Sequence, residues 1–250
     1  MDYFEYISEL KSYADSIDIR CYQAHAPFPS DTDSETITCI IRSIKAAAIM
    51  GAEIIVIHPM RGEGRLYREC SDEIFEENIK FYNTLLPYAR ENDIIIALEN
   101  MYMTDLRRGI KVSNVCSHSD EFVKYLDALN SDYITACLDI GHAALVSDCP
   151  ANMIKKLGNR IGALHVHDVD YTNDNHTLPY LGKLNWNEIC NALAKINYKG
   201  NFTFEADAFY SEYMDDDFIP KAAAFAHEVG RSLIKKIINY QITNGGSNDE

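Results

Sequence analysis

The sequence predicts an α/β protein in which parallel strands close into a (β/α) barrel. Six short apolar runs rich in β-branched residues alternate with stretches of helical spacing, a pattern typical of a parallel sheet covered by helices. Each run also ends in ionisable side chains. The carboxyl ends of barrel strands converge on one face, whereas an open sheet spreads its strand ends along a line. Six polar strand ends therefore favour the barrel.

The expected strands coincide with these six runs. They span residues 18–25, 53–59, 93–100, 134–142, 161–168 and 201–207. A complete barrel has eight strands, so this count is two short. The segment before the first run, "YFEYISELKSYADSI", has helical spacing and does not supply a strand.

Helices are expected between the strands, where apolar residues recur at helical spacing. The stretch 34–51 ends in Gly51, a helix stop signal. The stretches 71–93 and 119–130 both open with a Ser-Asp cap followed by glutamate. Two further helices are expected over 185–200 and 219–242.

Length and composition predict one barrel domain over residues 1–242 and a flexible polar tail over 243–250. No apolar run approaches the roughly 20 residues that span a bilayer, and the acidic start lacks signal-peptide features. The seven scattered cysteines include no C-x-x-C pair, which argues against disulfides and zinc–thiolate sites. We therefore expect a cytoplasmic protein. The net charge of -15 argues against a broad nucleic-acid interface.

Three carboxylates and one histidine at strand ends predict a divalent metal site. Glu99, Asp139 and Glu205 each follow an apolar run on a different strand. Converging carboxylates repel one another unless a cation holds them. His165 adds a nitrogen donor, and the set contains no thiolate. These donors suit a catalytic ion, with Mn2+ or Zn2+ favoured and Mg2+ or Co2+ also compatible.

Histidines gather at the same strand ends. Six of the eight lie there or in the loops just after: His25, His58, His142, His165, His167 and His176. Gly141, between Asp139 and His142, can supply a backbone turn that lets both side chains face one centre. The alternative role for Asp139 is a helix N-cap.

The long polar loop after the fifth run carries a second feature, the D-x-H pair of Asp174 and His176. Long loops on the carboxyl face of a barrel often carry function. Gly182 and Trp186 are expected to shape this loop and its docking.

Two basic loops stand out in a chain this acidic. One follows His58 and contains Arg61, Arg65 and Arg68; the other follows Glu99 and contains Arg107, Arg108 and Lys111. Arginine forks suit phosphate or carboxylate groups. Ordinary solvated loop charge explains them equally well.

Seven short motifs, in order, resemble those of the xylose-isomerase-like TIM-barrel superfamily: HAPF, VIHP, ALEN, CLDIGHA, LHVHD, DNHTLPYLGKLNW and FEAD. They run from His25 to Asp207. That superfamily includes sugar-phosphate isomerases and epimerases, ketose 3-epimerases and metal-dependent apurinic/apyrimidinic endonucleases related to AP endonuclease family 2. The resemblance implies that the six runs match the third to eighth strands, so the first two strands would be missing.

The resemblance also implies roles for individual residues. One divalent ion would be held by Glu99, Asp139, His165 and Glu205, with the two glutamates acting as the acid/base pair. His142 would contact substrate, and we add His167, Arg61 and Arg65 as substrate-binding candidates. The endonucleases carry further metal ligands, and the corresponding or possible additional positions here are His25, His58, His142, Asp174 and His176.

The leading hypothesis is a metal-dependent isomerase or epimerase of a small sugar or sugar phosphate, working by proton transfer through an enediolate. The alternatives are a multi-zinc phosphodiesterase of the AP-endonuclease type and a barrel that binds a ligand without turnover. An open barrel edge would expose unpaired backbone groups. A homodimer is therefore expected, in which the segment around Tyr3, Phe4, Tyr6 and Ile7 covers the gap.

Overall fold

The computed structural model describes residues 2–62, 64–146 and 148–245. They fall into two compact units. The first unit contains Met1–Met101, Asn114–Cys116 and Glu121–Cys137, and the second contains Tyr102–Ser113, Ser117–Asp120 and Leu138–Glu250. The single domain expected over 1–242 stays a prediction.

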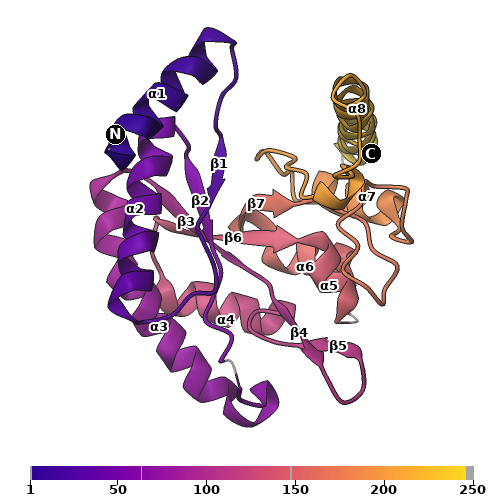
Figure 1. Ribbon diagram of the computed structural model, residues 1–250. Coiled ribbons are helices and arrows are strands. Elements are labelled where there is room, and N and C mark those ends of the chain that lie inside the picture. Colours follow the sequence, from indigo (N-terminus) through magenta and orange to yellow (C-terminus); the bar gives the residue numbers. More distant parts are fainter. Residues whose placement is uncertain (1, 63, 147, 246–250) are drawn as a thin grey trace. The chain divides into compact units, whose positions relative to one another are not determined.

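The first unit contains parallel strands, with the first three helices of the chain on one side of them (Figure 1). The strands β1 (Gln23–His25), β2 (Ile54–Ile57), β3 (Ile95–Glu99) and β6 (Ile134–Asp139) lie in that order, each beside the next. His25 is level with Val56, and Ile57 is level with Leu98. The carboxyl ends of neighbouring strands therefore lie at one edge of the sheet. The interior residues of β2 and β3 are fully buried, as their apolar sequences predict.

The fifth expected strand is also present, and the sixth is reduced to a bridge. β6 ends in the second unit, where β7 (Ile161–His165) follows it in the strand order. The run 201–207 forms one parallel bridge, between Val166 and Phe204. A 3-10 turn at Asp207–Phe209 ends the extended segment directly afterwards, so the full-length strand expected there was wrong. Among the described residues, no strand precedes β1, which agrees with the sequence count.

The helices of the first unit begin and end close to the predicted positions. They are α1 (Tyr3–Ser16), α2 (Ser34–Met50) and α3 (Tyr67–Glu91), followed by α4 (Ser119–Leu129), which begins in the second unit. The Asp33 carboxylate caps α2 by accepting hydrogen bonds from two backbone N–H groups, and Gly51 ends it at φ 80°. α3 starts before residue 71, but its backbone is non-helical at Cys70. The predicted Ser-Asp start lies at that break.

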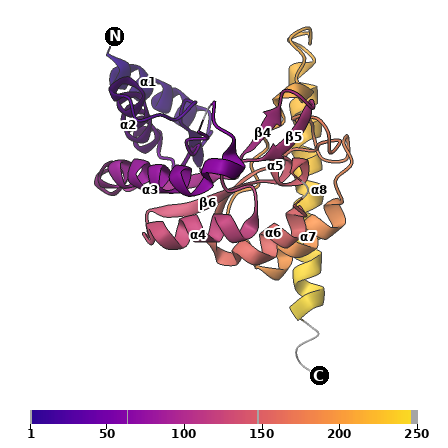
Figure 2. The ribbon, with the colours of Figure 1, turned by 90° about the horizontal axis from the view of Figure 1, so that it is seen from below.

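The second unit contains elements that the sequence did not predict. A hairpin is formed by the antiparallel strands β4 (Tyr102–Asp105) and β5 (Ile110–Ser113). Short helices α5 (Ile140–Leu145) and α6 (Pro150–Leu157) follow β6. The predicted helices α7 (Trp186–Lys195) and α8 (Ile219–Gly245) are confirmed. α7 packs between α6 and α8, as Figures 1 and 2 show.

The structure bears on two further predictions, the polar tail from residue 243 and the absence of a membrane span. α8 continues through Gly245, so the tail expected from residue 243 begins as helix. Residues 246–250 lie outside the described part of the chain. No helix among the described residues is long and apolar enough to cross a membrane.

Candidate metal centre

The first unit brings three of the predicted residues together at the ends of neighbouring strands. His25 ends β1, His58 follows β2 and Glu99 ends β3. The Nε2 atoms of the two histidines are 3.1 Å apart. They lie 3.7 Å and 3.2 Å from Glu99 Oε2. Two imidazole nitrogens that face one carboxylate oxygen form a set that could hold a divalent ion.

Neighbouring groups fix the orientation of these rings. His25 Nδ1 lies 2.6 Å from the Ala26 carbonyl oxygen. With the proton on Nδ1, that atom donates to the carbonyl, and Nε2 presents a lone pair to the centre. The Phe28 ring stacks on His58 at 4.9 Å and meets His25 edge-on at 5.8 Å. The two histidines are therefore held in place by contacts outside the ligand set.

The second unit brings together Asp139, His165 and Glu205. Their ligand atoms lie within 4.8 Å of one another. His165 Nδ1 is 2.8 Å from Glu205 Oε2 and 4.0 Å from Asp139 Oδ2. Asp139 and His165 are buried, whereas the Glu205 side chain is about one-third exposed. These three residues are three of the four ligands that the sequence predicted, and Glu205 is the one that solvent reaches.

Asp139 has two roles in this geometry. Its Oδ1 accepts a hydrogen bond from the His142 backbone N–H at 2.6 Å, so the N-cap alternative is realised. Its carboxylate also lies 3.0 Å and 3.1 Å from His167 Nε2. Capping occupies one oxygen, and Oδ2 faces the His142 and His165 rings. The cap and a metal-ligand role are therefore compatible.

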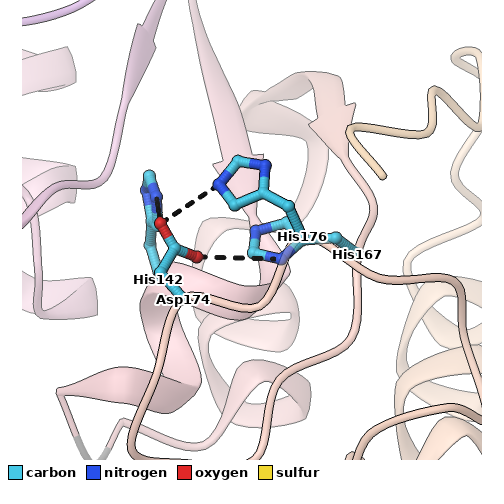
Figure 3. A group of neighbouring side chains, drawn as sticks. All are labelled: His142, His167, Asp174 and His176. Atoms are coloured by element: carbon cyan, nitrogen blue, oxygen red, sulfur yellow. Dashed lines mark hydrogen bonds and ion pairs between the residues drawn. The ribbon is translucent and has the colours of Figure 1, made fainter. Parts of the chain in front are cut away.

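A second cluster of the same unit contains His142, His167, Asp174 and His176 (Figure 3). The Asp174 carboxylate lies at its centre. Oδ2 is 3.1 Å from His176 Nε2 and 3.6 Å from His142 Nε2, while Oδ1 is 3.9 Å from His167 Nδ1. The His167 and His176 rings stack at 4.4 Å. The D-x-H loop thus meets α5, which follows β6, and the segment after β7.

Charge and burial in this cluster shift two pKa values in opposite directions. Burial alone raises the pKa of Asp174, but hydrogen bonds and positive charge from His142 and His176 outweigh it and hold that pKa well below its usual range. The hydrogen bond to Asp174 and the nearby carboxylates raise the pKa of His176 to about 9, against the effect of burial. At neutral pH a cation that binds through His176 therefore displaces a proton.

Two atoms of the cluster identify where an ion would fit. His167 Nδ1 and Asp174 Oδ1 face each other, are buried, and have no hydrogen-bond partner among the described residues. Buried polar atoms without partners are costly, and such pairs often mark a missing ion or water. Three imidazoles and one carboxylate form a donor set suited to Zn2+ or a similar divalent ion.

Gly141 makes room for the cluster, in a different way from the one predicted. It lies inside α5 and is not among the glycines with positive φ, so it does not supply a special backbone turn. A Cβ atom at this position would lie 2.1 Å from His167 Cε1. A glycine is therefore required because the His167 ring occupies the space beside it.

Gly141→Ala is expected to displace His167 and to weaken divalent-metal binding by the second cluster. It should also lower the free energy of unfolding by about 1–3 kcal/mol, the usual cost of overpacking. Metal titration and chemical denaturation measure the two effects. Gly230→Ala is the matched control, because its Cβ would meet only the edge of Phe204 at 3.2 Å. Unchanged metal affinity in Gly141→Ala would contradict this role.

The loop that carries Asp174 and His176 is held by Asp168. This fully buried carboxylate accepts four hydrogen bonds, from the backbone N–H groups of Val169, Tyr180 and Leu184 and from Trp186 Nε1. A Cβ at Gly182 would lie 2.3 Å from Asp168 Oδ1. The predicted roles of Gly182 and Trp186 in shaping the loop follow from these contacts.

Tyr102 is a residue of the cluster that the sequence did not single out. Its hydroxyl donates to Asp174 Oδ2 at 2.8 Å, and its ring meets His142 edge-on at 4.9 Å. Lys111 Nζ lies 4.6 Å from the centre of the same ring. The hairpin therefore contacts the cluster through Tyr102. An aromatic residue just after the third run was the available signal.

Tyr102→Phe is expected to weaken metal binding by the second cluster by about tenfold or more, because groups that orient metal ligands typically contribute that much. The ring and its contact with His142 remain in this variant, so only the hydroxyl is tested. Tyr213→Phe, at an exposed tyrosine of the same unit, is the control. Equal affinities in the two variants would show that the hydroxyl does not position Asp174.

The predicted substrate-binding residues have unequal environments. Arg61 lines a cavity of about 480 Å³ together with Ser30, His58 and Lys80. Arg65 lines the same cavity, but its guanidinium lies 3.0 Å and 2.5 Å from the two Glu77 oxygens and is therefore already paired. His167 is fully buried with Nε2 on Asp139, a geometry that favours positioning over substrate contact.

Comparison with known proteins identifies the family. A model described as "Xylose isomerase-like TIM barrel" matches residues 2–230. Among solved structures, a D-tagatose 3-epimerase-like protein superposes with a TM-score of 0.72 at 23% identity, covering 92% of this chain and 84% of that one. D-psicose 3-epimerase from Clostridium cellulolyticum H10 gives 0.72 at 18% identity, covering 93% and 84%. At these identities the likeness shows the fold.

Curated relatives are longer than this chain. The chain is 25% identical over 185 residues to the uncharacterized protein y4fM of Sinorhizobium fredii and 30% identical over 192 residues to the uncharacterized protein MJ1311 of Methanocaldococcus jannaschii. These matches include 73% and 72% of the chain and span 56% and 62% of the relatives. D-psicose 3-epimerase of Enterocloster bolteae is 30% identical over 117 residues, 47% of the chain and 35% of that enzyme. With its family match over most of its length, the chain belongs to the xylose isomerase-like TIM barrel family.

Proposed function

We propose that the protein is a metal-dependent isomerase or epimerase of a small sugar or sugar phosphate. The observation that carries the proposal is the convergence of Asp139 and His165, which end β6 and β7, with Glu205, which follows the bridge at Phe204 and is partly open to solvent. The similarity to D-psicose 3-epimerase supports a sugar substrate.

The metal would be held by Asp139, His165 and Glu205. Glu99 as the fourth ligand stays a prediction from the sequence. Mn2+ or Zn2+ suits these oxygen and nitrogen donors, and Mg2+ or Co2+ is also compatible. When bound, a divalent ion supplies a Lewis acid that polarises the substrate carbonyl and acidifies the neighbouring C–H.

The side chains would then move the proton. Glu205, oriented by His165 at 2.8 Å, removes the proton from the carbon next to the carbonyl and leaves an enediolate. Glu99 is proposed as the partner that returns a proton, which completes epimerisation or isomerisation. His142 is the substrate-contact candidate, and its Nε2 is oriented by Asp174 at 3.6 Å.

Solvent exchange tests the proposal directly. Metal-loaded protein is incubated in deuterium oxide with ketoses, aldoses and their phosphates, and deuterium at the carbon next to the carbonyl is followed by NMR. Incorporation that is lost on chelation and restored by Mn2+ or Zn2+ is expected. Competition by inorganic phosphate would indicate a phosphorylated sugar near Arg61. No incorporation from any sugar, with metal bound, would overturn the proposal and favour a barrel that binds without turnover.

A multi-metal phosphodiesterase is the second candidate, and two observations favour it. His25, His58 and Glu99 form one additional ligand set, and the cluster around Asp174 forms another. Clustered ions can activate water and stabilise a leaving oxygen. Metal analysis and activity together separate the candidates, because exchange of a sugar C–H with solvent fits the epimerase, whereas three zinc ions per chain with cleavage of a phosphodiester fit the second.

A further inference from the structure

The first helix presents an apolar seam to solvent. The α1 seam consists of four side chains of α1 and the C-cap residue that follows it, all 41–64% exposed: Tyr3, Tyr6, Leu10, Tyr13 and Ile17. Their spacing alternates between three and four residues, the a/d repeat of helices that pair along a shared seam. Five large apolar side chains in one row form a patch rather than scattered surface residues.

The opposite side of α1 is already used inside the first unit. Phe4, Ile7, Lys11 and Ala14 are less exposed than the seam, and α1 packs on α2 (Figure 2). Lys11 Cε lies 3.5 Å from where a Cβ on Gly51 would be, at the end of α2. The helix therefore has two apolar faces, and the seam is the one that α2 leaves uncovered. Of the four residues expected to cover a gap, only Tyr3 and Tyr6 lie on it.

We propose that the α1 seam docks on the same seam of a second copy of the chain, antiparallel and about a two-fold axis near Leu10. A regular a/d row can meet itself across such an axis. With about 200 Å² of surface per large side chain, the exposed fractions give each copy roughly 500 Å² of seam surface that a partner can bury. Two copies therefore bury about 1,000 Å², the lower limit for a specific interface. Tyrosine at three of the five positions suits a reversible interface.

Charge selects the antiparallel arrangement. Asp2, Glu5 and Glu9 make the first half of α1 acidic. In the second half, the charges of Lys11 and Asp15 cancel, because the two side chains form an ion pair at 2.5 Å. Parallel helices would place the two acidic halves together, whereas antiparallel helices place each one beside a balanced half. The helix dipoles also favour antiparallel pairing.

Sedimentation over a range of concentrations tests the dimer. The wild-type chain is expected to be a reversible dimer. Leu10→Asp and Leu10→Lys should each lower the association constant at least about a hundredfold, because two buried leucines are lost and two charges are placed at the axis. Ser8→Asp, exposed and off the seam, is the control and should still dimerise. Helix content by circular dichroism must match in all four proteins.

Cross-linking tests the orientation. Leu10→Cys should join to itself across the axis under oxidation, and mass spectrometry of peptides would identify the link. Tyr3→Cys should not self-link, because the antiparallel arrangement places it near Ile17 of the partner. A monomer at every concentration, or a dimer unaffected by both charged Leu10 variants, would overturn the proposal. Self-linking of Tyr3→Cys but not of Leu10→Cys would overturn the antiparallel arrangement.

Discussion

Glu205→Gln is expected to abolish turnover and to weaken metal binding at Asp139 and His165. Glutamine keeps the shape of the side chain but removes its negative charge and its ability to accept a proton. A positioned general base typically contributes 10²–10⁴-fold, so turnover should fall by about three orders of magnitude. The exchange of substrate C–H with solvent deuterium measures the rate, and metal analysis after dialysis measures the affinity.

Glu212→Gln is the matched control for this experiment. It removes the same charge from an exposed position shortly after Glu205 and should leave both measurements unchanged. If turnover and metal content both survive Glu205→Gln, the site is misassigned. If metal content alone falls, while turnover with excess metal is normal, Glu205 is a ligand and the proton is moved by another group.

The parallel strands could be predicted because their signal is local. β2 and β3 are almost wholly apolar, and strands buried on both faces require this. The hairpin of β4 and β5 carries no such signal, because its residues are only partly buried and its turn contains Arg107 and Arg108. Its two strands are stabilised by pairing with each other. That pairing joins residues of two separate segments, so the sequence of either strand alone does not reveal it.

The candidate ligands could be predicted because topology brings them together. Parallel strands in register place their carboxyl ends at one edge, so the histidine after β2 and the glutamate that ends β3 become neighbours. The roles of individual atoms could not be predicted. His167 follows β7 two residues after His165, but its Nε2 faces Asp139, and this leaves only Nδ1 for the second cluster. Which nitrogen faces which partner depends on contacts between distant segments.

Gly141 and Asp168 illustrate the same limit. A glycine between Asp139 and His142 suggests a flexible turn. In the structure it is required because the ring of His167, 26 residues later in the chain, fills the space that a Cβ atom would need. Asp168 reads as one more ionisable group at a strand end. Its carboxylate instead serves four donors of the following loop, which only the folded loop reveals.

Asp168→Asn is expected to lower the free energy of unfolding by about 3 kcal/mol or more. An asparagine turns one of the two oxygens into an NH2 group that faces two donors. These are either Val169 N–H and Leu184 N–H, or Tyr180 N–H and Trp186 Nε1–H. Each buried donor left without an acceptor costs about 1–3 kcal/mol. Chemical denaturation, followed by the fluorescence of the single tryptophan, measures the loss.

The same substitution should also weaken metal binding by the second cluster without touching a ligand. The Asp168 backbone N–H donates to the Thr177 carbonyl at 2.8 Å, so its side chain and backbone together hold both ends of the loop that carries Asp174 and His176. Asp170→Asn is the control, because this partly exposed carboxylate accepts hydrogen bonds from Thr172 and Asn173, at the loop's tip. A loss of stability in Asp168→Asn with unchanged metal affinity would show that the cluster forms independently of the loop's anchor. Equal stabilities of the two variants would show that the buried carboxylate of Asp168 contributes no more than that of Asp170.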